Sequence, residues 1–326
     1  MDSLIQVLII VISSLCSFIF FIYYYYQFWN GKEGKNRVPR AGGALPIIGH
    51  LHLFGPKQLV HKTLAAMADK HGPAFTIRLG SQENLVISNW QMAKECYTTH
   101  DKVFIGGAKI TAAKLLTYNF AMFGFAPYGS YWREMRKIAT LELLSHRRVD
   151  MLHHIRASEV QTSLKELYDL WVSRKNQKNG LLVDMKKWFE DLSLNATVRM
   201  VGGKRFVGDS KETETRSQQK VMRDFMYYFG VFVISDYIPL LGWLDIQGHQ
   251  KTMRKMAKEL DTLIGGWLDE HKRKKISGEG REDQDFMDVM IKVLEDADFP
   301  GFDADTINKA TCLVIARFSF WFLSKV

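Results

Sequence analysis

The first 30 residues contain the feature that most limits what this chain can fold into. From Leu4 to Phe28 there is no charged side chain. As a helix rising 1.5 Å per residue, these about 25 residues span roughly 37 Å, which is enough to cross a hydrocarbon core of about 30 Å with some tilt. The segment therefore predicts an N-terminal transmembrane helix.

A cleaved signal peptide is the alternative interpretation of this segment. It would need a basic start, a shorter apolar core and a cleavage site of small residues, and the sequence has none of the three. We therefore expect an uncleaved signal anchor.

The flanks of the apolar segment predict its orientation. Tyr23 to Tyr26 and Trp29 form an aromatic belt at its C-terminal end, whereas the short N-terminal flank carries only Asp2. Basic residues follow the belt, so the positive-inside rule places the bulk of the chain in the cytosol; they are Lys32, Lys35, Arg37 and Arg40.

Composition narrows the class of protein. The formal net charge of +9 suits an anionic membrane surface, nucleic acid or an acidic partner. Cys16, Cys96 and Cys312 are far apart, which excludes a disulfide framework and a zinc spacing and fits a reducing compartment.

A hinge rich in proline and glycine, Val38 to Gly49, follows the basic patch. Its two prolines and three glycines exclude a regular helix or strand, so it predicts a stiff, irregular linker. His50 and His52 come next, and without further ligands they are interpreted as loop residues rather than a metal site.

The rest of the chain predicts a mainly α fold with one small β-hairpin. The hairpin is expected from strands at 75–79 and 85–88, and a polar loop is expected at 208–219. Apolar spacing and capping residues predict helices from 55 to 71, 90–99, near 108–116, from 131, and at 145–173, 182–201, 221–233, 248–276, 286–294 and after Asp303.

The helix that begins after Phe125 carries the main candidate site. Pro127, Gly129 and Ser130 predict a turn and a helix cap. Trp132 and Arg136 are four residues apart, so an indole N–H and a guanidinium share one face. Both groups are donors, and a carboxylate or phosphate would satisfy them. The alternative is a Trp–Arg stack with no ligand, and the residues alone leave both open.

Other common catalytic motifs are absent from the sequence. Gly202-Gly203-Lys204 lacks the upstream glycine of a phosphate-binding loop, and there is no GxGxxG, HExxH or GxSxG. His146, His153 and His154 have no cysteine or acidic pattern near them that would make a metal site. No metal ligand set is therefore predicted.

Several motifs in this order resemble a plant microsomal cytochrome P450 monooxygenase. They are the signal anchor, the basic patch, the hinge ending Leu45-Pro-Ile-Ile-Gly49, the hairpin, and Ala126-Pro-Tyr-Gly-Ser-Tyr-Trp-Arg-Glu-Met-Arg-Lys137. The hinge from Pro39 to Pro46 is most similar to that of the plant family numbered 82, which acts in specialised metabolism. The resemblance runs from residue 1 to about Val314.

This resemblance implies a fold and an activity. The fold would be an incomplete cytochrome P450 fold, and the activity an NADPH- and O2-dependent oxidation of a small lipophilic plant metabolite by haem. Trp132 and Arg136 would hold a haem propionate. The partners would be membrane, O2, substrate and an acidic NADPH-cytochrome reductase, with no nucleic acid, and the location a single-pass anchor in the endoplasmic reticulum.

The resemblance also implies a substrate pocket. The loop from Phe104 to Phe125 would lie over the substrate, and Met222 to Pro239 would form part of the roof. An aromatic and methionine stripe such as 221–233 is otherwise typical of a core. The pocket residues expected are Phe104, Ile110, Phe120, Phe123, Phe125, Phe225 and Phe229.

The sequence departs from the family in its last part. Family members hold the haem iron by a cysteine thiolate in a Phe-x-x-Gly-x-Arg-x-Cys-x-Gly loop, and these 326 residues contain no such loop. The oxygen-activating Asp/Glu-Thr pair is missing after Ala310 to Leu313, and Glu270 to Arg273 matches the ExxR motif only by chance.

We therefore expect a fragment with no complete catalytic set. Its parts would be an anchor at 1–30, a hinge at 31–54, a partial catalytic domain at 55–314 and a divergent tail at 315–326. The alternative function is a catalytically inactive membrane-anchored protein without bound haem.

Overall fold

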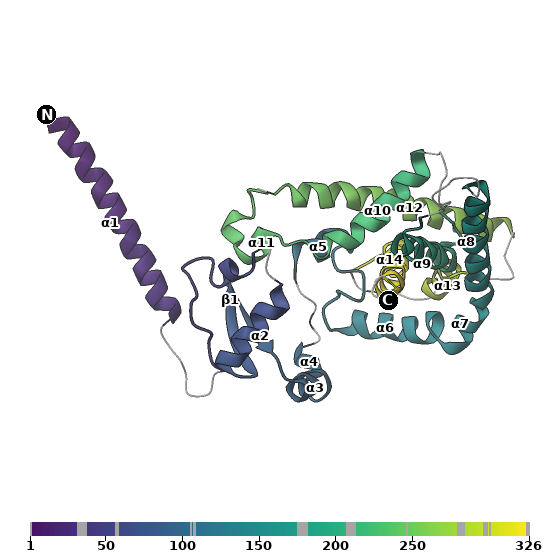
Figure 1. Ribbon diagram of the computed structural model, residues 1–326, viewed down its shortest axis with the longest axis horizontal. Helices are drawn as coiled ribbons and strands as arrows, with labels where there is room; N and C mark the ends of the chain where they lie inside the picture. Colours follow the sequence, from purple (N-terminus) through teal and green to yellow (C-terminus); the bar gives the residue numbers. More distant parts are fainter. Residues whose placement is uncertain are drawn as a thin grey trace. The chain divides into compact units, whose positions relative to one another are not determined.

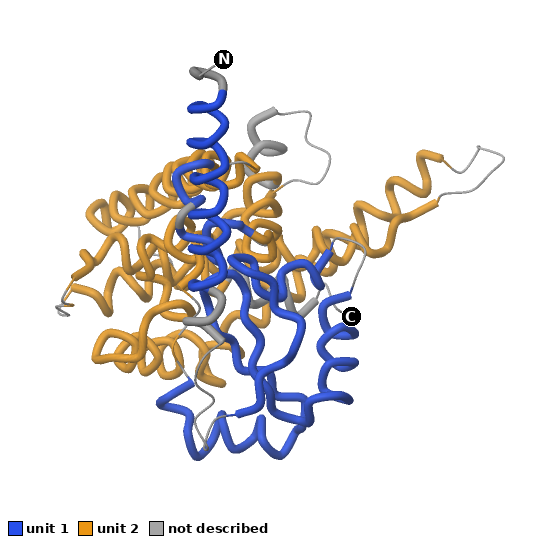
Figure 2. The backbone as a smooth tube through the Cα atoms, turned by 90° about the vertical axis from the view of Figure 1, so that its left-hand side faces the viewer, with its two compact units in different colours: residues 1–104, 233–244 blue, residues 105–232, 245–326 orange. Residues whose placement is uncertain are grey.

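The computed structural model describes residues 2–30, 38–55, 59–104, 106, 109–174, 182–206, 213–245, 247–278, 284–295, 299 and 301–323. They form two compact units, unit 1 of residues 1–104 and 233–244 and unit 2 of residues 105–232 and 245–326 (Figure 2). The four-part division expected from the sequence stays a prediction, because compactness does not test functional boundaries.

The N-terminal segment is one continuous helix, α1, from Asp2 to Asn30 (Figure 1). Its stretch Ile5–Tyr25 has a mean hydropathy of 2.7 and no buried side chain. By length and composition this helix can cross a membrane, as the sequence predicts.

Unit 1 contains the predicted hairpin. Strand β1, Ala74–Leu79, pairs antiparallel with β2, Gln82–Ile87, through the two-residue turn Gly80-Ser81. Strand β2 begins three residues earlier than predicted, because Gln82 to Asn84 join the ladder despite their polar side chains. Gly80 has φ +59°, and a side chain there would collide with the carbonyl of Tyr237, whose oxygen accepts a hydrogen bond from Ser81 N at 2.8 Å.

The hinge is irregular, as predicted, but it is more than a linker. Arg40 forms a parallel bridge with Thr76 and Gly49 an antiparallel one with Leu79, so both ends of the hinge bond to the edge of β1. His50 is buried between them: its Nδ1 accepts from Arg78 N at 3.0 Å, which leaves Nε2–H to donate to Ala41 O at 3.2 Å. The sequence did not reveal this pairing, because it depends on a strand some 30 residues away.

Short helices complete unit 1. They are η1 (Leu51–Leu53), α2 (Val60–His71), α3 (Trp90–Thr98), α4 (Asp101–Phe104), α11 (Ile234–Tyr237) and η3 (Pro239–Leu241). The helix predicted from 55 to 71 corresponds to α2, and residues 56–58, where it was expected to open, lie outside the described residues.

Unit 2 is helical in its described part. Helix α14 packs against α9, α12 and α13 (Figure 1). The elements are α5 (Thr111–Leu116), α6 (Ser130–Ile138), a π-helical turn η2 (Ala139–Leu143), α7 (His146–Met151), α8 (His153–Arg174), α9 (Met185–Gly202), α10 (Thr213–Tyr228), α12 (His249–Ser277), α13 (Phe286–Leu294) and α14 (Ala304–Leu323).

Several boundaries in unit 2 differ from the prediction, and the single helix predicted at 145–173 is divided at Leu152 into α7 and α8. Helix α10 begins at Thr213, inside the predicted loop, because its Glu, Gln, Arg and Lys residues are good helix formers. Helix α6 begins at Ser130 with Gly129 as its N-cap, and no side chain caps it. The divergent segment continues α14 to Leu323 without a proline or glycine to stop it.

The cationic end of α12 is largely paired with carboxylates. Lys272 bonds to Asp305 at 2.6 Å, and Lys275 to Glu295. Glu270 accepts from Lys204 and Lys274, and these bonds lower its pKa to about 2. Glu270, the glutamate of the chance ExxR match, thus forms structural ion pairs with two lysines.

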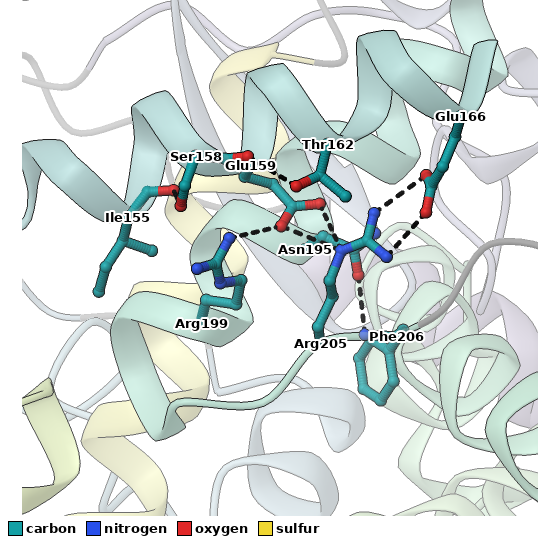
Figure 3. A network of polar contacts seen from close by, with 9 residues as sticks. All are labelled: Ile155, Ser158, Glu159, Thr162, Glu166, Asn195, Arg199, Arg205 and Phe206. Atoms are coloured by element: carbon teal, nitrogen blue, oxygen red, sulfur yellow. Dashed lines mark hydrogen bonds and ion pairs between the residues drawn. The ribbon is translucent and has the colours of Figure 1, made fainter. Parts of the chain in front are cut away.

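A buried carboxylate joins α8 to α9 and to the segment after α9 (Figure 3). The Glu159 side chain is fully buried, and it accepts from Arg199 Nη1 at 2.9 Å and from Arg205 Nε at 2.9 Å. Arg205 also makes a two-pronged contact with Glu166, at 2.9 and 3.0 Å. A buried charge held by two partners is costly to disturb.

Replacing Glu159 with Gln should lower the free energy of unfolding by about 3–5 kcal/mol, since two guanidinium groups lose the carboxylate that offsets their desolvation. Urea unfolding of the full chain, followed by tryptophan fluorescence, would measure the change. The matched control is Glu166→Gln, on the same Arg205 but 47% exposed, which should cost about 1 kcal/mol or less. Equal losses in the two variants would contradict the assignment.

A second buried ion pair joins α12 to the start of α13. His271 Nδ1 donates to Trp267 O at 2.7 Å and Nε2 donates to Asp285 Oδ2 at 2.9 Å, so both ring nitrogens face acceptors. Asp288 lies nearby, but this pairing leaves neither nitrogen free to bind a metal. Burial is the largest single influence on the pKa of His271 and would lower it. The bond to Asp285 and the charge of that carboxylate, together with the bond to Trp267 O and the charge of Asp288, outweigh burial and raise the pKa above its ordinary value.

This pair should make stability depend on pH. Because the folded-state pKa is raised, its full contribution is present below the unfolded pKa of about 6.5 and is lost as pH rises through the folded value. The difference in Tm between the native chain and His271→Gln should therefore be larger at about pH 6 than at about pH 9. The control His146→Gln changes an exposed histidine and should show no such trend; a pH-independent difference for His271 would refute the prediction.

Candidate functional site

Helix α6 places Trp132 and Arg136 on one face. The Arg136 guanidinium lies over the Trp132 ring, 5.0 Å from its centroid, and the Tyr128 ring packs against the same tryptophan with centroids 5.4 Å apart. Met135 of the same helix is fully buried, which anchors the helix. The stacking alternative is therefore realised in the structure.

The stack leaves the N–H groups of Arg136 able to donate hydrogen bonds. Its side chain is exposed, and within the described ranges no carboxylate pairs with it. A guanidinium held flat on an indole keeps its N–H groups directed outward. The pair therefore fits an anionic group such as a carboxylate, and stacking and anion binding are compatible.

The loop before α6 is fixed by Tyr131. Its hydroxyl donates to Ala121 O, and its ring packs against Phe299 and Phe302 with centroids 5.8 and 5.1 Å away. Burial raises the pKa of Tyr131 above its ordinary value, so it stays a neutral phenol. Residues 121–126 are thereby tied to α6 and to the segment before α14.

The predicted pocket residues lie in different places. Phe125 stacks on Phe229, the residue just after α10, with centroids 4.9 Å apart, and Phe225 of α10 meets the same ring edge-on at 5.1 Å. Phe225 is 1% exposed and belongs to the core, whereas Phe125 and Phe229 are only partly buried. This aromatic cluster joins the loop to α10.

The other predicted pocket residues take no part in the contacts of that cluster. Ile110 is the N-cap of α5, Phe123 is partly buried in the loop, and Phe120 has a left-handed backbone with φ 70°. Phe104 ends α4 in unit 1 and is 40% exposed. Their role as substrate contacts stays a prediction.

None of the three cysteines offers a thiolate. Cys312 is buried on α14, donates to Asn308 Oδ1 at 3.3 Å, and has its pKa raised by burial and by the charge of Asp285. Cys96 lies half-buried on α3, and Cys16 lies exposed on α1. The residues present thus fit the carboxylate end of a haem but supply no axial ligand for its iron.

Comparison with known proteins identifies the class. Residues 39–316 match the family model of cytochrome P450, and the chain belongs to the cytochrome P450 family. A zebrafish cytochrome P450 solved with progesterone superposes with a TM-score of 0.60 at 18% identity, covering 79% of this chain and 55% of that one. This likeness shows the fold.

Plant relatives are more similar in sequence. Strychnine-10-hydroxylase of Strychnos nux-vomica is 50% identical over 295 residues, covering 88% of this chain and 56% of the relative. Cytochrome P450 82A1 of Pisum sativum is 47% identical, covering 84% and 55%, and xanthotoxin 5-hydroxylase CYP82C2 of Arabidopsis thaliana is 46% identical, covering 86% and 55%. The chain spans about half the length of these relatives, and the predicted likeness to plant family 82 is confirmed.

Proposed function

We propose that this chain is the membrane-anchored N-terminal part of a haem monooxygenase that oxidises a small lipophilic plant metabolite with O2 and NADPH. The observation that carries the proposal is the Trp132–Arg136 pair, an anion-binding arrangement in a chain 50% identical to a named plant hydroxylase. When bound, haem supplies the iron at which O2 is activated.

The chain's own residues would bind and orient the cofactor. Arg136 donates to a propionate through a charge-assisted hydrogen bond, and the Trp132 indole N–H offers a second donor. Their mutual stack reduces the side-chain freedom lost on binding. Phe125 and Phe229 would form an apolar wall that excludes water from the substrate side.

Helix α1 would hold the enzyme in the endoplasmic reticulum membrane with the rest of the chain in the cytosol. The net charge of +9 favours an acidic partner, which we propose to be the reductase domain that passes electrons from NADPH. Two relatives, strychnine-10-hydroxylase and xanthotoxin 5-hydroxylase, are named for the compound that they hydroxylate. Their names support a specialised metabolite as the substrate of this chain.

A second candidate function is a catalytically inactive membrane protein without haem. It is favoured by the cysteines, because Cys312 is a buried, hydrogen-bonded thiol and neither Cys16 nor Cys96 lies near α6 in sequence. In the first candidate, residues outside these 326 supply the axial thiolate to the haem iron. In the second candidate, no such thiolate is supplied.

Expressed with haem, the 326-residue chain should give no reduced-CO band of the kind that names the family, because no thiolate is available to the iron. A chimera in which residues after Val314 are replaced by the corresponding part of strychnine-10-hydroxylase should give the band. A band from the unmodified chain would disprove the assignment of its cysteines. A chimera that folds but takes up no haem would favour the inactive protein.

In the same chimera, Arg136→Ala should weaken haem retention about tenfold or more, because a charge-assisted hydrogen bond contributes about 1.5–3 kcal/mol. Transfer of haem to apomyoglobin would measure it. The matched control is Arg133→Ala on the same helix, whose guanidinium lies over Tyr128 at 5.7 Å and should leave retention unchanged. Similar losses in both variants would refute the proposed role of Arg136.

A further inference from the structure

The last turn of α12 carries a serine directly after a run of basic residues. Ser277 is the final residue of the helix, and its side chain is exposed. The basic run, Arg273 to Lys275, lies four to two positions before it. An accessible hydroxyl with cations on its N-terminal side is the charge pattern that a protein kinase with an acidic substrate groove recognises.

The Ser277 hydroxyl bonds within its own helix. Its Oγ donates to Lys274 O at 3.1 Å, three residues earlier. Because this bond lies at the surface, water can replace it at little cost in free energy. The oxygen is therefore accessible to a reagent in solution.

The end of α12 can also open without disturbing the rest of the helix. Residues 275–278 are all exposed, and Ile276, the one apolar side chain among them beside the glycine, is 86% exposed. Opening this turn therefore takes no buried side chain into water. Helix ends of this kind unfold locally at low cost, which gives the segment access to the extended form in which kinases bind their substrates.

The two lysines of the run are paired, but only weakly held. Lys274 pairs with Glu270 and Lys275 with Glu295, and the lysine side chains are 36% and 48% exposed. Ion pairs this exposed contribute little stability, so both ammonium groups can move to carboxylates of a partner. Glu270 would keep Lys204 as its partner when Lys274 leaves.

Arg273 lies where it could hold a phosphate on Ser277. The two residues are four apart, so their side chains share one face of α12. Arg273 Nε donates to Asp269 O at 3.4 Å, and in the part of the chain that the structure describes no carboxylate pairs with this guanidinium. A guanidinium binds phosphate through two parallel N–H bonds, which would offset the repulsion between the phosphate and the negative end of the helix dipole.

We propose that Ser277 is a phosphorylation site for a protein kinase that recognises basic residues before its serine. The γ-phosphoryl group of MgATP is transferred to Ser277 Oγ: the P–Oγ bond forms, the bond from the γ-phosphorus to the β–γ bridging oxygen breaks, and ADP leaves. The hydroxyl proton passes to a carboxylate of the kinase. Since the phosphate carries a charge of about −2, the formal net charge of +9 falls to about +7.

This inference goes beyond the proposed function, because it involves neither haem nor the Trp132–Arg136 pair. In the orientation that we propose for α1, this end of α12 lies in the cytosol, where MgATP is present. The phosphorylation can be tested without haem, so its failure and a failure of haem retention are distinguishable.

The test treats the full chain in lipid nanodiscs with MgATP and the catalytic subunit of cAMP-dependent protein kinase, and follows each phosphorylated residue with time by peptide mass spectrometry. Ser173 is the internal control: it is exposed near the end of α8 and donates to Leu170 O at 2.8 Å in the same geometry, but the four residues before it include no cation. Ser277 should be phosphorylated about tenfold faster than Ser173 or more, the value of a charge-assisted hydrogen bond to the kinase.

Replacing the two lysines together, Lys274→Gln with Lys275→Gln, should lower the initial rate at Ser277 by about the same factor. The matched control is Lys251→Gln with Lys255→Gln, which removes two exposed lysines near the start of the same helix and should leave the rate unchanged. Circular dichroism would verify that both variants are folded. No phosphate on Ser277, an equal rate at Ser173, or an unchanged rate in the Lys274 and Lys275 variant would overturn the proposal.

Discussion

Polar groups buried among the helices of unit 2 must find partners there, and this constraint determines how the helices are joined. Glu159 has two arginines, and the imidazole of His271 has an acceptor at each nitrogen. Asn308 accepts from Cys312 and donates to Met287 O at 3.3 Å. The bonds of Glu159 to its two arginines, of His271 to Asp285 and of Asn308 to Met287 O join segments far apart in sequence. The cost of burying a polar group therefore selects one arrangement of the helices.

Some buried polar atoms do not satisfy this constraint. Five side-chain atoms that the structure describes are buried without a hydrogen bond of good geometry, and the Tyr118 hydroxyl is one of them. The backbone of Tyr118 is left-handed, with φ 52°, which costs further free energy. The Asp261 carboxylate beside the hydroxyl offsets part of the cost of burying it.

The residues that we propose to bind haem are positioned by contacts within one short segment. The Arg136 guanidinium already lies over the Trp132 ring, so the anion binding that we propose would lose less side-chain entropy. Tyr131, one residue before Trp132, ties the preceding loop to the same helix through Ala121. The anion-binding residues and the aromatic cluster of Phe125 and Phe229 are therefore positioned by one short segment.

The sequence by itself determined the features whose signal is local. The apolar span of α1, the long α12, the short α13 and the shared face of Trp132 and Arg136 follow from composition and helical spacing, which neighbouring residues set. Tertiary structure alone decided the bonding of the hinge to β1, the pairing of the α12 lysines and the meeting of Tyr118, Asp261 and Lys309. The reason is physical: these contacts join residues many positions apart, and their energies depend on burial and distance, which appear only once the chain has folded.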